Sequence, residues 1–232
     1  MSTEIIPTAS VVYPESDGKP VGETDDHRDL MFELIFVLRN WLRERTAYVA
    51  GNLFVYYEQG QSTAVVAPDV FVVFDVPQQQ RRIYKTWEHD GKTPNFVIEL
   101  TSAGTRYEDL GMKRVLYAEL GVQEYYLFDP LGDYLKPQLR AYQLVDGELL
   151  PLPGPRFFSG LLGLELRAEG SSLRLYDVQT GERLAVPAEI EAAQRREASA
   201  RAAAEAEARA EAEAEIARLQ AELARLRASG AP

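Results

Sequence analysis

The chain has 232 residues, of which 46% are hydrophobic and 10% aromatic, so it can fold as one domain with a full core or as two small ones. It contains no cysteine, which excludes a disulfide framework, a thiol nucleophile and a cysteine-ligated metal, and fits a cytoplasmic protein. The formal net charge of −11 repels phosphate backbones, so binding of nucleic acid must depend on a local site. No apolar run reaches the roughly 18 residues of a membrane span, and we expect neither a signal peptide nor a membrane partner.

After an N-terminal extension over residues 1–20, the pattern over residues 21–187 alternates between helical and strand periodicity. Residues 27–45 place apolar side chains at helical spacing, with N-cap candidates from Thr24 to Asp26. Residues 48–58 and 65–76 predict two strands. Pro68 lies inside the second one, where a missing ladder donor marks an edge, a bulge or a strand start.

The middle of the chain predicts a strand, a helix and another strand. The first strand covers residues 95–101, and Thr105 and Glu108 match a capping box that opens the helix. Gly121 closes this helix, and the second strand covers residues 122–129.

Further strands follow. Residues 138–149 start a meander, with a turn at Asp146–Gly147, and residues 161–167 and 173–178 form a C-terminal β-hairpin around Glu169–Gly170. Since hairpins precede the helical crossover, we predict one α/β domain with a mixed sheet flanked by helices.

The tail, residues 188–228, consists almost entirely of the helix formers Ala, Glu, Arg and Leu, and predicts a long C-terminal α-helix. It holds nine Glu and seven Arg, so it accounts for only −2 of the net charge. Three Glu–Arg pairs have the favourable i, i+4 order: Glu191–Arg195, Glu197–Arg201 and Glu205–Arg209. A short a/d seam follows at Ile216, Leu219, Leu223 and Leu226. The tail is either a solvated helix or a weak coiled coil.

Two carboxylates occupy unusual positions in the predicted strands. Glu99 interrupts an apolar run, where an unpaired charge costs several kcal/mol, and Asp69 follows Pro68. If these strands are neighbours, both carboxylates converge on one sheet edge, and they suit Mg²⁺ or Mn²⁺, with the Leu100 carbonyl as a further ligand. The alternatives are a turn role for Asp69 and a structural ion pair between Glu99 and Lys113 or Arg114.

The helix after Glu99 presents Asp109, Lys113 and Tyr117 on one face, at i, i+4 and i+8. Lys113 could point its ammonium at Glu99 and position a water or stabilise charge in a transition state. Asp109 and Tyr117 fit supporting roles better than catalytic ones. The apolar residues expected to pack this helix on the sheet are Leu110, Val115, Leu116 and Leu120.

Basic residues that could contact DNA are sparse. Arg81, Arg82 and Lys85 lie in a predicted loop between the two acid-bearing strands, with Tyr84 and Trp87 interleaved for stacking. The alternative is that Trp87 packs inward and the arginines keep a long loop soluble.

Two residues of the first helix could complete a metal site. His27 stands at its start, and Glu33 lies one and a half turns further on. A capping or solvated role for His27 is the alternative.

The segments "PDVFVVFDV", "FVIELTSAGTRYEDLGMKRVLYAELGVQEYYLFDP" and "YPESDGKPVGETDDHRDLM" resemble the Uma family of bacterial restriction-endonuclease-like proteins, a branch of the PD-(D/E)XK nuclease superfamily. The resemblance implies a restriction-endonuclease-like fold with Asp69 and Glu99 as the metal-binding acids. The superfamily usually carries a lysine where Thr101 stands, and the family pattern implies that Lys113 replaces it from the helix.

The resemblance implies Mg²⁺-dependent hydrolysis of DNA phosphodiester bonds by an endonuclease, and cleavage of both strands favours a homodimer. The main alternative is a catalytically inactive nuclease fold that binds a protein partner through its C-terminal helix. A hydrolase acting on a smaller phosphoester is a third reading.

Overall fold

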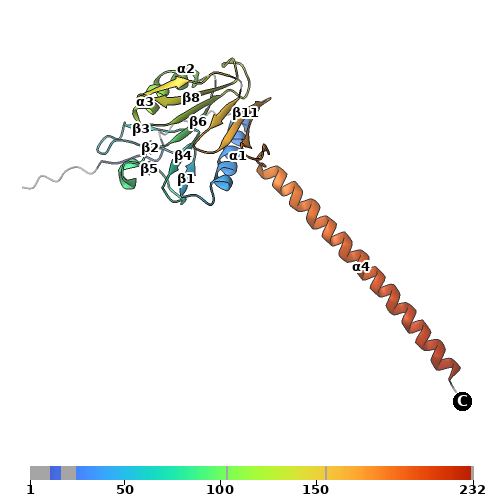
Figure 1. Ribbon diagram of the computed structural model, residues 1–232. Helices are drawn as coiled ribbons and strands as arrows, with labels where there is room; N and C mark the ends of the chain where they lie inside the picture. The colour runs from blue at the N-terminus through green and yellow to red at the C-terminus, as the bar shows by residue number, and fades with distance from the viewer. Residues whose placement is uncertain (1–10, 17–24, 103, 155, 231–232) are drawn as a thin grey trace, which may run out of the picture. The chain divides into compact units, whose positions relative to one another are not determined.

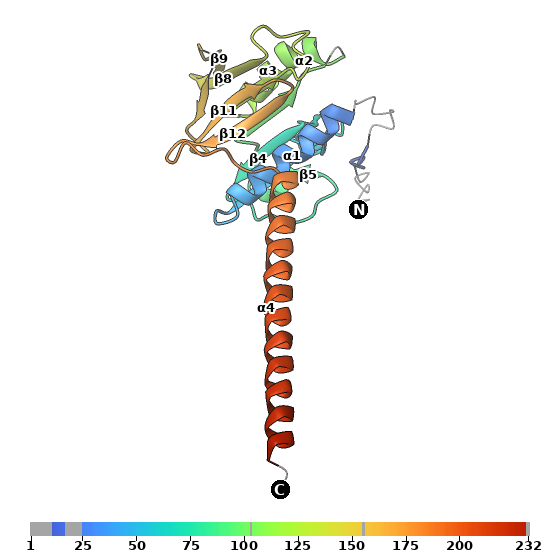
Figure 2. The same ribbon diagram turned by 90° about the vertical axis from the view of Figure 1, so that its right-hand side faces the viewer.

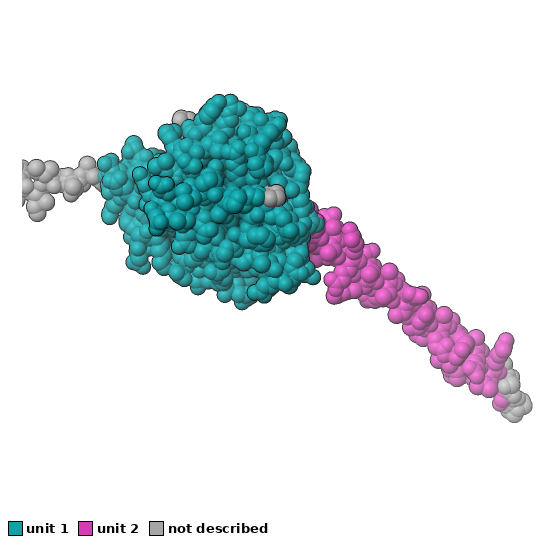
Figure 3. Space-filling view, turned by 45° about the horizontal axis from the view of Figure 1, so that its top comes forward, with its two compact units in different colours: residues 1–184 teal, residues 185–232 magenta. Residues whose placement is uncertain are grey.

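The computed structural model describes residues 11–16, 25–102, 104–154 and 156–230. The chain divides into two compact units, residues 1–184 and residues 185–232, which Figure 3 shows in separate colours. The N-cap candidate Thr24 and most of the expected extension over residues 1–20 lie outside the described residues.

A six-stranded mixed sheet forms the centre of the first unit (Figure 1). Its strand order is β1-β4-β6-β7-β8-β9; the pair β6–β7 is parallel and the other neighbouring pairs are antiparallel. The strands are β1 (Ala47–Ala50), β4 (Val70–Phe74), β6 (Phe96–Leu100), β7 (Glu124–Phe128), β8 (Leu139–Val145) and β9 (Glu148–Pro151). This sheet confirms the fold class predicted from the sequence.

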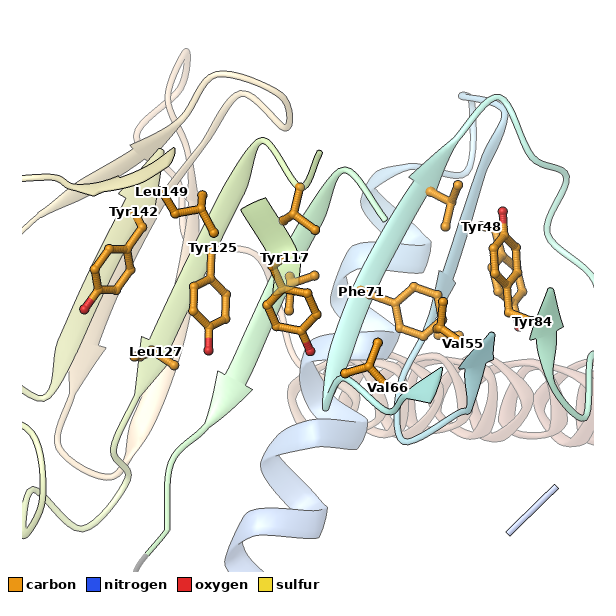
Figure 4. Close-up of a cluster of buried hydrophobic side chains, with 14 of the residues drawn as sticks. Tyr48, Val55, Val66, Phe71, Tyr84, Tyr117, Tyr125, Leu127, Tyr142 and Leu149 are labelled. Atoms are coloured by element: carbon orange, nitrogen blue, oxygen red, sulfur yellow. The ribbon is translucent and has the colours of Figure 1, made fainter. Parts of the chain in front are cut away.

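Helices pack against this sheet. Helix α1 (Asp25–Trp41) contacts β1 and β4 and buries Leu34 and Leu38. Helices α2 (Arg106–Leu110) and α3 (Met112–Glu119) connect the parallel strands β6 and β7, as a parallel pair requires. Tyr117 of α3 joins the buried cluster that also holds Tyr125 (Figure 4).

Two smaller sheets complete the first unit. One has the order β3-β2-β5, from β2 (Val55–Tyr56), β3 (Val65–Val66) and β5 (Tyr84–Lys85), and a 3-10 helix, η1 (Thr86–His89), follows it. The other consists of β10 (Phe157–Ser159), β11 (Leu164–Glu169) and β12 (Ser172–Asp177). Strands β11 and β12 form the predicted C-terminal hairpin, and β12 contacts α1 (Figure 2).

The two strands predicted over residues 48–58 and 65–76 are each broken in two, so this expectation was wrong in detail. The chain leaves the main sheet at Gly51 and re-enters it after Pro68, whose carbonyl accepts a hydrogen bond from the Asn52 N–H at 2.8 Å. Asn52 has a positive φ of 47°, which ends the regular strand. Pro68 therefore marks a strand start, one of the options that its missing donor left open.

The helix predicted between Thr105 and Gly121 is also divided, at Gly111. The capping box is wrong: the Thr105 side chain does not cap α2, and its Oγ1 accepts a hydrogen bond from the Ser102 N–H at 3.2 Å. Val115 was expected to pack on the sheet, yet it is exposed, and Tyr117 is the fully buried residue of α3. Gly121, with φ of 76°, follows the helix as predicted.

The second unit contains α4 (Pro187–Ser229), which confirms the long C-terminal helix. Its side chains are exposed over residues 193–227. Two of the expected Glu–Arg pairs form, Glu191–Arg195 and Glu197–Arg201, whereas Arg209 pairs with Glu213 at 2.8 Å and not with Glu205. In the described part of the chain, no helix combines the length and apolar character needed to cross a bilayer.

Candidate active site

Asp69 and Glu99 face each other across the antiparallel strands β4 and β6. Val70 pairs with Ile98, so one further step of this register brings Asp69 opposite Glu99. The Asp69 N–H donates a hydrogen bond to Glu99 Oε2 at 3.3 Å, and the Leu100 N–H donates one to Asp69 Oδ2 at 2.7 Å. The two acids thus meet at one sheet edge, as the sequence led us to expect.

The Glu99 carboxylate is buried and receives donors from α3. The Tyr117 hydroxyl donates to Oε1 at 2.5 Å, and the Lys113 ammonium lies 3.0 Å from the same oxygen. Strand alternation explains the contact, because Val97 and Glu99 point to the face of the sheet on which Tyr117 packs. Hydrogen-bond donors and a cation surround this carboxyl group and offset part of the cost of placing it in an apolar strand.

Lys113 is held between two carboxylates. Its Nζ lies 2.9 Å from Asp109 Oδ1, one helical turn back, and 3.0 Å from Glu99 Oε1. Asp109 is buried, and its carbonyl accepts a hydrogen bond from the Tyr125 hydroxyl at 2.9 Å. Figure 4 shows Tyr117 and Tyr125 side by side, with their hydroxyl groups pointing the same way. Arg114, the other candidate partner of Glu99, lies over the Tyr142 ring instead.

Burial and neighbouring charges shift the protonation of this cluster. Burial raises the pKa of Glu99; the Lys113 ammonium opposes this rise, and the negative charge of Asp69 reinforces it. Burial alone would lower the pKa of Lys113, but the surrounding carboxylates outweigh it and raise that pKa above its ordinary value. Lys113 is therefore an ammonium at neutral pH.

His27 reaches the cluster from the first turn of α1. Its Nε2 lies 3.5 Å from Asp69 Oδ1, and its side chain is only 12% exposed. Glu33, the other candidate on this helix, is paired with Arg174 of β12 at 2.7 Å. The structure thus brings His27 to the acid pair and engages Glu33 elsewhere.

The residues present fit a divalent cation. Three carboxyl groups, those of Asp69, Glu99 and Asp109, converge near one ammonium, and burial, reinforced by their mutual repulsion, raises the pKa of Glu99 and of Asp109. A divalent cation bound between them would favour their charged forms. The buried Thr101 hydroxyl, two residues after Glu99, has no hydrogen-bond partner among the described residues. Within the described residues, no three His, Cys, Asp or Glu side chains form a metal cluster, so carbonyl and water ligands would have to complete the shell.

The basic residues predicted to contact DNA have other partners. Arg82 pairs with Glu15, Lys85 pairs with Glu88 at 3.0 Å, and Arg81 stacks 4.2 Å from the centre of the Tyr48 ring. In the described part of the chain, none of these three basic side chains pairs with Asp69 or Glu99. Trp87 packs against Tyr13, in agreement with the alternative that it turns inward.

Gly51 supports the site, and the sequence analysis did not identify it. A Cβ at this position would lie 1.9 Å from the Asp69 carbonyl oxygen and 2.8 Å from Ile35 of α1. Only a glycine lets the chain after β1 approach Asp69 and Ile35 this closely. The available signal was the Gly–Asn pair inside a predicted strand.

The fold and the site define a class of protein. A mixed sheet with a parallel β6–β7 pair and two acids at its edge are features of the restriction-endonuclease-like class, whereas the lysine here comes from the crossover helix and not from the strand. Residues 13–156, more than half of the chain, match the model of Uma2, described as "Putative restriction endonuclease", and the chain belongs to this family.

The chain is also similar to a solved structure. The crystal structure titled as a "putative nuclease belonging to DUF820" from Anabaena variabilis ATCC 29413 is 16% identical in sequence. The match covers 60% of this chain and 73% of that chain, with a TM-score of 0.44. No curated protein matches the chain.

Proposed function

We propose that this protein is an endonuclease that hydrolyses DNA phosphodiester bonds with Mg²⁺ or Mn²⁺. The observation that carries the proposal is the cross-strand pair of Asp69 and Glu99, in a cluster where three carboxylates face one ammonium. A purely structural ion pair needs one carboxyl group beside the ammonium, whereas this cluster holds three, and a divalent cation would offset the repulsion between them.

Asp69 and Glu99 would hold the ion, together with the Leu100 carbonyl. A divalent cation bound here would lower the pKa of a bound water and offset charge on the phosphate. Lys113 remains charged, so it orients the attacking water or stabilises charge and does not remove a proton. Asp109 and Tyr117 hold Lys113 and Glu99 in place.

DNA as the substrate follows from the family, whose description names a restriction endonuclease. The residues of the site recognise a phosphodiester and do not distinguish DNA from RNA. The restriction-endonuclease class also favours an assembly of two chains, since cutting both strands needs two active sites.

Plasmid cleavage tests the proposal. The wild-type protein should nick supercoiled plasmid only with Mg²⁺ or Mn²⁺, and Asp69→Ala and Glu99→Ala should both abolish nicking. Lys113→Ala should reduce turnover more than it reduces metal affinity. If both acid variants nick as fast as the wild type, the activity comes from a contaminant and the proposal fails.

A second candidate function is a binding module that uses α4. Ile216, Leu219, Leu223 and Leu226 are between 47% and 63% exposed, so this apolar seam could pack against another helix. In a parallel coiled coil of two chains, Glu222 before one core position would face Arg227 of the other chain, a favourable pair.

Truncation separates the two functions. Light scattering of the chain without residues 188–232 should show a loss of self-association if α4 joins two copies or binds a partner helix. If association is unchanged, the binding-module function loses its basis.

A further inference from the structure

Strand β1 forms the outer edge of the main sheet, and two adjoining cavities flank it. Their volumes are about 460 and 400 Å³, and they share Arg39 and Gln78 as lining residues. Their lining contains no acidic residue among those described, although the whole chain has a net charge of −11. We call this surface the arginine groove, and its arginine and glutamine members are Arg39, Arg43, Arg45, Arg81, Gln78, Gln79 and Gln80. Of these, Arg43 pairs with the neighbouring Glu44 at 3.2 Å.

Three of these arginines are anchored by main-chain carbonyls. Arg39 donates to the Val49 carbonyl at 3.0 Å, and Arg45 donates to that of Leu161 at 2.9 Å. Arg81 donates to the Pro77 carbonyl at 3.2 Å. In the described residues no ion pair joins these three to a carboxylate, so their positive charge stays uncompensated.

The anchoring also fixes the guanidinium groups before a ligand binds. Arg45 lies 4.5 Å from the centre of the Phe74 ring, and Arg81 lies 4.2 Å from that of Tyr48. Each arginine retains further N–H donors, since a guanidinium has five. An ordered arginine loses less conformational entropy on binding than a free surface side chain does.

The same side chains close the sheet edge to another strand. The Val49 N–H donates to Gln78 Oε1 at 2.7 Å, and the Val49 carbonyl accepts from Arg39. The groove therefore does not offer an edge for strand addition, and its remaining donors suit an anion.

We propose that the arginine groove binds the phosphodiester backbone of duplex DNA. Guanidinium groups match phosphate oxygens in geometry, and the groove supplies the local positive site that a chain of net charge −11 needs. This proposal rests on the proposed nuclease function, because it names the surface that positions the substrate.

The groove lies near the end of β4 that is remote from Asp69. Pro77 lines it just beyond Phe74, and Asp69 precedes Val70 at the other end of the strand. Five strand residues separate the two ends by roughly 17 Å. The groove thus contacts DNA away from the bond that is cut. Arg82 and Lys85, which carboxylates already neutralise, are not part of this surface.

Fluorescence anisotropy of a labelled DNA duplex in EDTA tests the groove without cleavage. Replacing Arg39, Arg45 and Arg81 together by glutamine should weaken binding at least about tenfold at roughly 0.1 M salt. The slope of log affinity against log salt should fall by about 3, close to one unit per phosphate contact.

A matched control removes the same charge elsewhere. Glutamine at Arg195, Arg201 and Arg209 of α4 makes the same change in net charge and should alter affinity less than about threefold. Lysine at the three groove positions keeps the charge and should restore most of the binding. Circular dichroism of each variant reports its folding, and Arg45→Glu alone, at an exposed residue, should weaken binding even if the triple variant misfolds.

The outcomes separate the groove from the nuclease proposal. If the folded groove variant binds like the wild type or like the α4 control, or if the wild type binds no duplex, the groove is not the DNA surface. If the wild type binds through the groove but cleaves nothing with Mg²⁺ or Mn²⁺, the nuclease function fails and the groove proposal stands.

Discussion

Lys113 approaches Glu99 from a helix and not from the strand that carries the acid. The position two residues after Glu99 holds Thr101, and the ammonium comes instead from α3, one turn beyond Asp109. Because Asp109 of α2 pairs with Lys113 of α3, the lysine is positioned before any ligand binds. Tyr117 then fixes the other partner, Glu99.

Tyr117→Phe removes a buried donor from Glu99. Leaving this carboxylate with one donor fewer should lower the free energy of unfolding by about 1–3 kcal/mol, measured by urea denaturation. Tyr142→Phe is the matched control, because the Tyr142 hydroxyl makes no hydrogen bond with the described residues, and it should change stability by less than about 0.5 kcal/mol. Equal effects of the two substitutions would contradict the role given to Tyr117.

Glu165 of β11 makes the stability of the protein depend on pH in the acid range. Hydrogen bonds from Arg167 and Arg156 lower its pKa from 4.5 to about 2. The folded state thus favours the charged carboxylate, so this contribution is present above about pH 4.5 and is lost as the pH falls towards 2.

Glu165→Gln should therefore destabilise the protein by about 1 kcal/mol at neutral pH, a modest value because its arginine partners are partly exposed. The difference from wild type should shrink between pH 4.5 and 2, followed by urea denaturation at each pH. A difference that stays constant over this range would show that the ion pair is not its source.

At the scale of elements, the break at Gly51 and Pro68 sets where β4 begins and hence where Asp69 stands. The chain crosses between the main sheet and the small sheet at these two points, and the Asn52–Pro68 hydrogen bond links them. The start of β4 is thereby aligned with the end of β6, which brings the two acids together.

Gly51→Ala should destabilise the protein by about 3 kcal/mol or more, because the new Cβ would clash with the Asp69 carbonyl. Gly160→Ala is the control: its Cβ would meet only a side-chain oxygen at 3.8 Å, and the expected change is below about 1 kcal/mol. Thermal unfolding of both variants checks this. A Gly51 variant as stable as the Gly160 variant would refute the tight packing of α1 on β4.

The sequence predicted β6, β7 and the β11–β12 hairpin because buried apolar runs and a Glu–Gly turn are local signals. It failed where tertiary contacts decide the local structure. The break at Gly51 depends on a carbonyl from β4, and the division at Gly111 is not visible in the apolar pattern. Val115 lies at a helical spacing typical of a core position and is exposed nonetheless.

The candidate site was predicted more fully than the packing around it. Asp69, Glu99 and Lys113 were identified from strand ends, helix spacing and family resemblance, and all three meet in the structure. The sequence could not show whether His27 or Glu33 reaches Asp69, because this depends on the angle at which α1 crosses the sheet. The arginine groove was missed because its members come from two separated segments, residues 39–45 and 78–81.

At the scale of the whole molecule, charge is distributed unevenly. The α4 tail is nearly balanced, so most of the net charge of −11 belongs to residues before it. Within these acidic surroundings, the carboxyl cluster at Asp69 and Glu99 and the positive arginine groove are both local features. The first suits a cation and the second suits a polyanion, and a metal-dependent nuclease needs both.

The most direct measurement of the central claim is a calorimetric titration with Mn²⁺ of the wild type and of Glu99→Gln. The account predicts that the wild type binds the ion and that the substitution, which keeps the size of the side chain, weakens binding at least about tenfold. Equal affinity of the two proteins, or no binding by the wild type, would contradict the claim that Asp69 and Glu99 share one divalent cation.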